Sequence, residues 1–212
     1  MKLTEKNKKT IKKVIIVIFL IYIFSLCLSM AIGTKLNSAP DEKMKYDVCK
    51  YIYNNLKLPH GGDESIRDAT WGISYAFTPI LSYMVSGVFM KVTGIFTQGK
   101  LPLLVSARLV SVLCLTGYAF LCIRISRKLF KEPIYQYMFV AFTTLLPQVL
   151  YLGSYINNDS LALLAIAIIV DAWLIGLESD WNWKSCIMLG IGIGVCALAY
   201  YNAYGYILCS VI

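Results

Sequence analysis

Charged residues are scarce in this chain. Asp, Glu, Lys and Arg together make up 15% of its 212 residues, against 58% for hydrophobic residues, and the mean hydropathy is +0.65. A soluble domain usually carries about 25% charged residues. Several apolar stretches also reach the length of about 18 residues or more at which a helix can cross a bilayer. The composition therefore excludes an ordinary soluble fold and predicts an all-α polytopic membrane protein.

Histidine is nearly absent, and the seven cysteines form no recognisable pattern. A single histidine, His60, argues against a histidine-based metal site. No Cys-x-x-Cys occurs, and only Cys49 lies in a polar segment. The other six cysteines lie inside apolar runs, where cysteine behaves as a small hydrophobe. The sequence predicts neither a disulfide framework nor a structural metal, and no cofactor follows from it.

Acidic residues are outnumbered by basic ones, 12 to 20, which gives a net charge of +8. The basic residues gather at the ends of apolar runs, a pattern that indicates membrane orientation rather than nucleic-acid binding. Residues 1–13 hold six lysines against Glu5 alone, and a second basic cluster spans Arg124 to Lys131. By the positive-inside rule both segments are predicted to be cytoplasmic.

Alternation from these two markers predicts five transmembrane helices, at 14–33, 101–123, 134–155, 160–177 and 185–209. Residues 1–13 would form a cytoplasmic tail, and residues 34–100 an extracytoplasmic loop with juxtamembrane helices. Residues 71–96 are largely apolar too, but a crossing there would put the Arg124 cluster outside, so we expect an interfacial helix. The chain stops at Ile212 while still apolar. We therefore expect it to be the N-terminal portion of a longer membrane domain, truncated at its C-terminal end.

The predicted extracytoplasmic loop is rich in acids and begins with a helix signal. Ser38, Pro40 and Asp41 predict a helix start with Ser38 as the N-cap. The apolar face of this helix would consist of Met44, Val48, Tyr51, Ile52 and Leu56. Asp41 and Glu42 would then lie in its first turn. Two interpretations stay open at this point: the acids complement the helix dipole, or they serve chemistry on a lipid-borne substrate at the membrane surface.

Four short motifs, taken in order, resemble the GT-C superfamily of membrane glycosyltransferases, which use polyprenyl-phosphate-linked sugars. The motifs are Pro40-Asp41-Glu42, Phe77-Thr-Pro79, Ser106-Ala-Arg108 and Asn157-Asn158-Asp159. The pairing of Pro-Asp-Glu with Asn-Asn-Asp is most similar to a bacterial branch of predicted membrane proteins. Phe77 stands where related sequences often carry an acid, and Lys45 where they often carry histidine.

The resemblance implies a GT-C-like helix bundle that performs inverting sugar transfer at the outer face of the cytoplasmic membrane, in cell-envelope polysaccharide or glycoconjugate assembly. Asp41 would be the general base that takes the proton of the acceptor hydroxyl. Glu42 would orient Asp41 or help to hold a divalent cation. Asp159 would join the catalytic group, or else cap the next helix.

The substrate-binding residues implied by the resemblance are Arg108, Lys45 and Asn158. Arg108 would bind the carrier phosphate, or it would pair with a loop carboxylate, since a buried guanidinium needs an anionic partner. The implied partners are the lipid-linked sugar donor, a glycan, lipid or protein acceptor, and membrane lipid, without nucleic acid. An alternative function is a transporter or flippase for a lipid-linked glycan, or a non-catalytic membrane subunit of its export.

Two further features concern the membrane-embedded part. Asp171 lies within an apolar run and is predicted to find a partner in the bundle, with Arg124 as the candidate. Gly190, Gly192 and Gly194 predict a small-residue patch for close helix packing.

Overall fold

The fold is entirely helical. The computed structural model describes residues 4–60, 62–69 and 72–211, and within these ranges it contains nine α-helices, three short 3-10 helices and no strand. The predicted all-α class is confirmed. Trp71, where the interfacial segment was expected to begin, lies outside the described residues.

Three helices are long and apolar enough to cross a membrane. They are α1 (Glu5–Gly33), α4 (Lys100–Leu129) and α7 (Asp159–Ser179). Each contains one of the predicted transmembrane segments and extends beyond it. The basic residues Arg127 and Lys128 occupy the last turn of α4, which therefore ends in charge rather than in apolar sequence.

The other two predicted spans are not single helices in the structure. The segment 134–155 forms α5 (Pro133–Thr144) and α6 (Pro147–Leu152), separated by a short turn. Pro147 causes the break because proline lacks an N–H and disfavours helical backbone in the preceding residue. Leu146 is accordingly extended, with φ −60° and ψ 132°.

The segment 185–209 is divided in a similar way. It forms α8 (Trp183–Ala199), a 3-10 turn at Tyr201–Ala203 and the short helix α9 (Tyr204–Leu208). Tyr200 is extended, with φ −162° and ψ 126°, and ends α8. With 17 residues, α8 is a shorter apolar helix than α1, α4 and α7.

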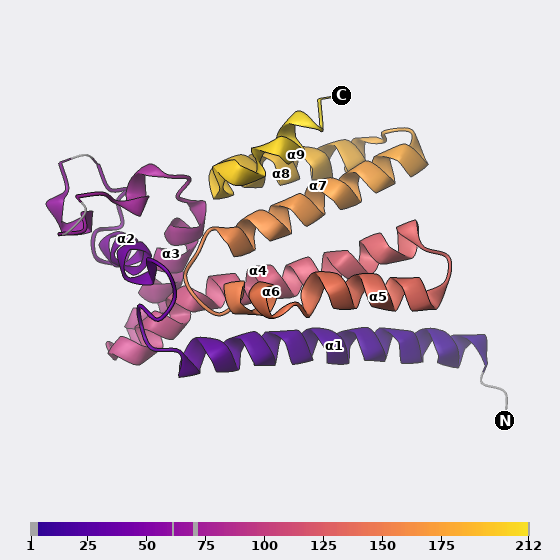
Figure 1. Ribbon diagram of the computed structural model, residues 1–212, viewed down its shortest axis with the longest axis horizontal. Coiled ribbons are helices and arrows are strands. Elements are labelled where there is room, and N and C mark those ends of the chain that lie inside the picture. The colour runs from indigo at the N-terminus through magenta and orange to yellow at the C-terminus, as the bar shows by residue number, and fades with distance from the viewer. Residues whose placement is uncertain (1–3, 61, 70–71, 212) are drawn as a thin grey trace.

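The long helices lie side by side, and the first loop gathers at one end of them (Figure 1). Helices α2 (Glu42–Asn55) and α3 (Leu81–Phe96) lie at the end where α1 finishes and α4 begins. The turn between α6 and α7 reaches the same end, whereas the N-terminus and the α4–α5 and α7–α8 turns lie at the opposite end. We call these the loop end and the basic end of the bundle.

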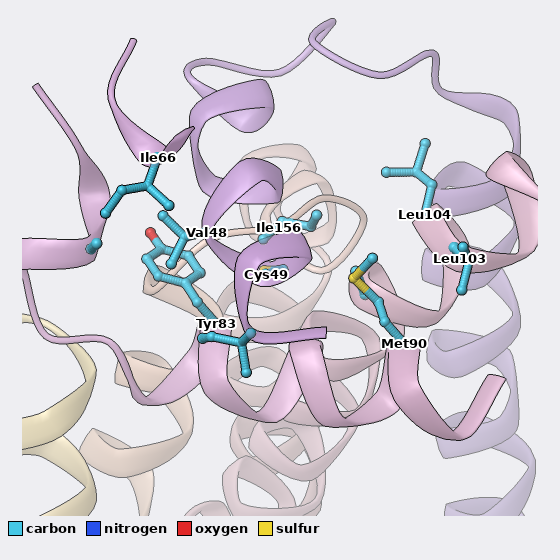
Figure 2. Packing of buried hydrophobic residues seen from close by; sticks show 11 residues of the cluster. Val48, Cys49, Ile66, Tyr83, Met90, Leu103, Leu104 and Ile156 are labelled. Carbon is cyan, nitrogen blue, oxygen red and sulfur yellow. The ribbon is translucent and has the colours of Figure 1, made fainter. Parts of the chain in front are cut away.

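At the loop end, α2 packs against α3 and the first turns of α4. Val48 of α2, Tyr83 and Met90 of α3 and Ile156 of the α6–α7 turn are buried in one cluster (Figure 2). Gly87 of α3 permits the close approach, because a Cβ there would lie 2.8 Å from Ile52 of α2. The loop end is therefore a packed layer that carries its own hydrophobic core.

The predicted amphipathic face of α2 is only partly correct. Val48 and Ile52 are buried as expected, but Leu56 is 62% exposed. The buried stripe continues toward the N-terminus through Lys45 and Glu42 instead. The helix thus buries two charged side chains next to its apolar core.

Candidate functional site

A fully buried ion pair joins α2 to α4 at the loop end. The Arg108 guanidinium donates from Nε to Glu42 Oε1 at 2.7 Å and from an Nη to Oε2 at 2.6 Å. Both side chains are fully inaccessible to solvent. This bidentate geometry matches the fork of the guanidinium to the two carboxylate oxygens. Of the two interpretations of Arg108, pairing with a loop carboxylate is the one observed.

Arg108 also closes the C-terminal end of α1. Its Nη atoms donate to the carbonyl oxygens of Ala31, Thr34 and Lys35, at 2.6, 2.7 and 3.3 Å. A helix C-terminus leaves carbonyl groups without intrahelical partners and carries partial negative charge. The guanidinium satisfies these carbonyls and leaves none of its donors for a carrier phosphate.

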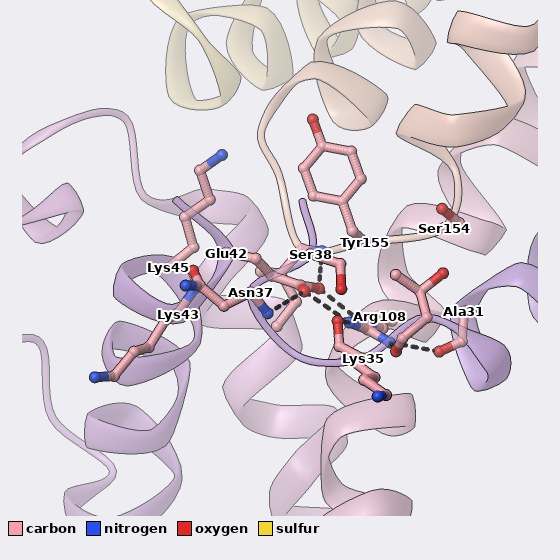
Figure 3. Close-up of polar contacts among 12 residues, drawn as sticks. Ala31, Lys35, Asn37, Ser38, Glu42, Lys43, Lys45, Arg108, Ser154 and Tyr155 are labelled. Atoms are coloured by element: carbon pink, nitrogen blue, oxygen red, sulfur yellow. Dashed lines mark hydrogen bonds and ion pairs between the residues drawn. The ribbon is translucent and has the colours of Figure 1, made fainter. Parts of the chain in front are cut away.

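Glu42 is saturated by contacts within the protein (Figure 3). Besides Arg108, Oε1 accepts from the Ile156 N–H at 3.2 Å and Oε2 from the Asn37 N–H at 3.3 Å. The carboxylate therefore links four segments: the α1–α2 connection, α2, α4 and the α6–α7 turn. Both oxygens of Glu42 are occupied by these hydrogen bonds, so neither is free to bind a cation. Glu42 instead holds the segments of the loop end together.

Asp41 has a different environment from its neighbour. It is the N-cap of α2, in the left-handed region at φ 56°, with no side-chain cap hydrogen bond. The prediction of Ser38 as N-cap is wrong, since α2 begins at Glu42. The Asp41 side chain is exposed, and the Tyr75 hydroxyl donates to Oδ2 at 2.7 Å. Burial first, and then this hydrogen bond to a carboxylate, raise the pKa of Tyr75, so the tyrosine remains a donor.

Lys45 lies one turn further along α2 and is buried, with 8% of its surface exposed. Its ammonium group donates to the Pro40 carbonyl at 3.1 Å and lies 5.2 and 5.5 Å from the ring centroids of Tyr75 and Tyr155. Burial lowers the pKa of Lys45, while the negative charges of Asp159 and Asp41 oppose that shift. A lysine ammonium has three N–H donors, so this group retains donors for an anion.

Lys45 also lies within electrostatic range of two aspartates that were predicted to belong to one catalytic group. Asp159 and Asp41 both act electrostatically on Lys45, although Asp159 begins α7 and Asp41 precedes α2. Asp159 does not cap α7, because the N-cap is Asn158 and Asn157 accepts the Ser160 N–H. Asp159 is partly exposed and makes no hydrogen bond or ion pair with any described residue. We call Asp41, Lys45, Tyr75 and Asp159 the loop-end site.

Asn158 connects this site to the Phe77-Thr-Pro79 motif. Its Nδ2 donates to the Pro79 carbonyl at 2.9 Å, while its Oδ1 is buried without a hydrogen-bond partner among the described residues. The adjacent Asn157 is fully buried and satisfied, and its carbonyl accepts from Ser82 of α3 at 2.8 Å. Of the two asparagines, Asn158 therefore retains a free acceptor next to the site.

No group of three or more His, Cys, Asp and Glu side chains suited to a metal ion is found among the described residues. Phe77 is 57% exposed and supplies no metal ligand. A cavity of about 680 Å³ lies at the basic end and includes no residue of the loop-end site. The loop-end site thus consists of charged and phenolic side chains, of which Asp41 is exposed and Lys45 is buried.

The second predicted ion pair lies toward the other end. Arg124 of α4 and the fully buried Asp171 of α7 approach to 2.9 Å, which confirms that pairing, although neither Asp171 oxygen meets hydrogen-bond geometry. Tyr75 and Tyr155 were not identified from the sequence. Aromatic residues are common near membrane surfaces, so nothing in the local pattern distinguished these two from ordinary interfacial tyrosines.

The chain was compared with protein-family models, with curated proteins and with solved structures, and none of them matches it.

Proposed function

We propose that this protein is a GT-C-type membrane glycosyltransferase, which transfers a sugar from a polyprenyl-phosphate-linked donor to an acceptor hydroxyl at the loop end. The observation that carries the proposal is the convergence of the four motifs. Glu42 binds Arg108 and the Ile156 N–H next to Asn157, and Asn158 binds the Pro79 carbonyl. Residues remote in sequence are thereby held around Asp41, Lys45 and Asp159.

In this proposal Asp41 is the general base. Tyr75 binds one of its oxygens, which leaves Oδ1 to accept the proton of the acceptor hydroxyl as the new glycosidic bond forms. The departing polyprenyl phosphate gains negative charge in the same step, and the Lys45 ammonium is the nearby cation suited to stabilise it. The partly exposed Asp159 carboxylate is an acceptor for sugar or acceptor hydroxyls.

The convergence favours this function over transport of a lipid-linked glycan. A transporter generally binds its substrate near the bilayer midplane, between broken helices related by internal repeats. The loop-end site instead lies beside the N-termini of α2 and α7, at one extremity of the bundle. Surface chemistry on a lipid-borne substrate suits this position better than passage through the membrane.

The test is a transfer assay on the full chain with defined polyprenyl-phosphate sugars, comparing the parent with Asp41→Asn. Asparagine tolerates the left-handed backbone of position 41, so the variant removes the base without straining the turn. We expect transfer to fall by about 100-fold or more.

Asp180→Asn is the matched control. Asp180 also adopts left-handed backbone, at φ 51°, but it follows α7 at the basic end. We expect this variant to transfer sugar at the parental rate. Full activity in Asp41→Asn would remove Asp41 from the chemistry, and a parent without transfer on any donor of the set would refute the proposed function.

A further inference from the structure

The cavity of about 680 Å³ at the basic end of the bundle is formed between α1, the end of α4 and α5. Its rim carries four cationic side chains: Lys12 and Lys13 of α1, Arg127 of α4 and Lys131 of the following turn. No Asp or Glu lines it. All four cations are exposed, and none forms an ion pair with a described residue.

The basic cluster at the end of α4 is divided between two faces. Arg124 pairs with Asp171 at 2.9 Å and Lys128 with Glu178 at 3.0 Å, so both cations are neutralised by acids of α7. Arg127 points to the other side and, with Lys131, lines the cavity. Of the cations in this cluster, the two that line the cavity, Arg127 and Lys131, form no ion pair with a described residue.

Beyond the cationic rim the lining becomes apolar. Two helices provide most of it: Ile15, Ile16, Phe19, Val140, Ala141, Leu145. From Lys12 to Phe19, α1 advances about 10 Å along its axis. The cavity therefore changes from charged to apolar in the direction that leads away from the basic end, into the bundle.

We infer that this cavity is a binding site for an anionic phospholipid, with the headgroup phosphate at Lys12, Lys13, Arg127 and Lys131 and an acyl chain along the apolar lining. The charge of the rim selects an anionic headgroup, and a basic pocket between transmembrane helices is a setting in which such headgroups bind. The apolar extension distinguishes a lipid from a soluble phosphate compound. The inference does not depend on the proposed glycosyltransferase function, because the loop-end site lies at the opposite end of the bundle.

The test is native mass spectrometry of the full chain, released from detergent and titrated with phosphatidylglycerol or phosphatidylcholine of the same acyl chains. We expect the parent to retain phosphatidylglycerol about tenfold more strongly than phosphatidylcholine, and the variant Arg127→Gln with Lys131→Gln to lose that preference. Equal retention of the two lipids by the parent would overturn the inference.

The matched control is Lys128→Gln with Lys184→Gln. It removes two positive charges from the same end of the bundle, but neither residue lines the cavity. We expect the control to bind phosphatidylglycerol as the parent does. An equal loss in both double variants would show general surface attraction and would overturn the inference of a defined site.

Two further experiments test whether the apolar lining of the cavity binds an acyl chain. Ala141→Trp fills the lining while keeping all four cations, and we expect it to reduce phosphatidylglycerol retention by about tenfold. Glycerol phosphate at a concentration equal to that of the lipid should not displace it. Unchanged retention in Ala141→Trp, or displacement by glycerol phosphate, would show that the acyl chain is not recognised and would contradict the lipid site.

Discussion

At the residue scale, two adjacent acids perform different tasks. Asp41 is exposed and contacts Tyr75, whereas Glu42 is fully buried and holds Arg108. The left-handed backbone at Asp41 and the start of α2 at Glu42 send the two side chains in different directions. A single step along the chain therefore separates a candidate catalytic carboxylate from a structural one.

The buried pair is expected to be critical for stability. Glu42→Gln leaves the Arg108 charge without a counter-ion at zero solvent exposure, so we expect the free energy of unfolding to fall by about 3–5 kcal/mol. Denaturation of the purified protein in detergent micelles measures the change. The control is Lys128→Gln, which breaks a pair whose acid is 60% exposed and should cost no more than about 1 kcal/mol. Equal effects in the two variants would refute a special role for the Glu42–Arg108 pair.

Lys45 is expected to set the alkaline limit of transfer. Burial lowers its pKa below the ordinary value of 10.5, so it loses its proton at a lower pH than an exposed lysine. A phosphate contact requires the charged form, and the rate should therefore fall as pH rises through the lowered pKa. An arginine side chain stays charged throughout the accessible pH range, so Lys45→Arg should shift the decline of the rate to higher pH. Lys45→Gln carries no charge and should lower the rate at every pH. A pH–rate profile that is the same in Lys45→Arg and the parent would assign the decline to another group.

At the element scale, helix contacts depend on individual small residues rather than on a patch. Of the three glycines predicted to form a packing surface on α8, only Gly192 meets α7 closely. A Cβ added there would lie 2.8 Å from the Ile169 side chain and 3.1 Å from its backbone nitrogen. Gly190 and Gly194 face open space. The sequence pattern located the helix contact but not the face that makes it.

Gly192→Ala is accordingly expected to destabilise the α7–α8 contact. The added methyl group must displace the α7 backbone, so we expect a loss of about 1–3 kcal/mol in the free energy of unfolding. Gly194→Ala, on the same helix and without a neighbour within 4 Å, is the control and should cost nothing measurable. Thermal denaturation of both variants in the same detergent compares them, and equal midpoints would contradict the close packing.

At the scale of the whole molecule, the charged groups are distributed between two ends. The loop end holds Asp41, Lys45 and Asp159, and the basic end holds the cluster from Arg124 to Lys131 together with the N-terminal lysines. Because cytoplasmic segments of membrane proteins carry an excess of lysine and arginine, we propose that the basic end faces the cytoplasm.

Cysteine labelling tests this orientation. With the exposed Cys186 and Cys209 replaced by serine, a membrane-impermeant maleimide should label Lys43→Cys in intact cells. It should label Lys184→Cys only after the membrane is opened, because Lys184 lies in the first turn of α8, at the other end. Labelling of both positions from the same side would show that the two ends do not lie on opposite faces of the membrane.

The sequence determined the class of the protein and the position of its long helices, because apolar length and basic flanks are local properties. It also identified Arg108 and Asp171 as charges that need partners, since an unpaired charge within an apolar run is costly. Tertiary structure alone decided that Glu42, and not Asp41, pairs with Arg108. It also decided that α8 ends at Tyr200, although the apolar run continues past that residue. The break before Pro147, in contrast, follows from a local property of proline. The Glu42–Arg108 pairing depends on backbone direction and on contacts between remote segments, which a local pattern does not encode.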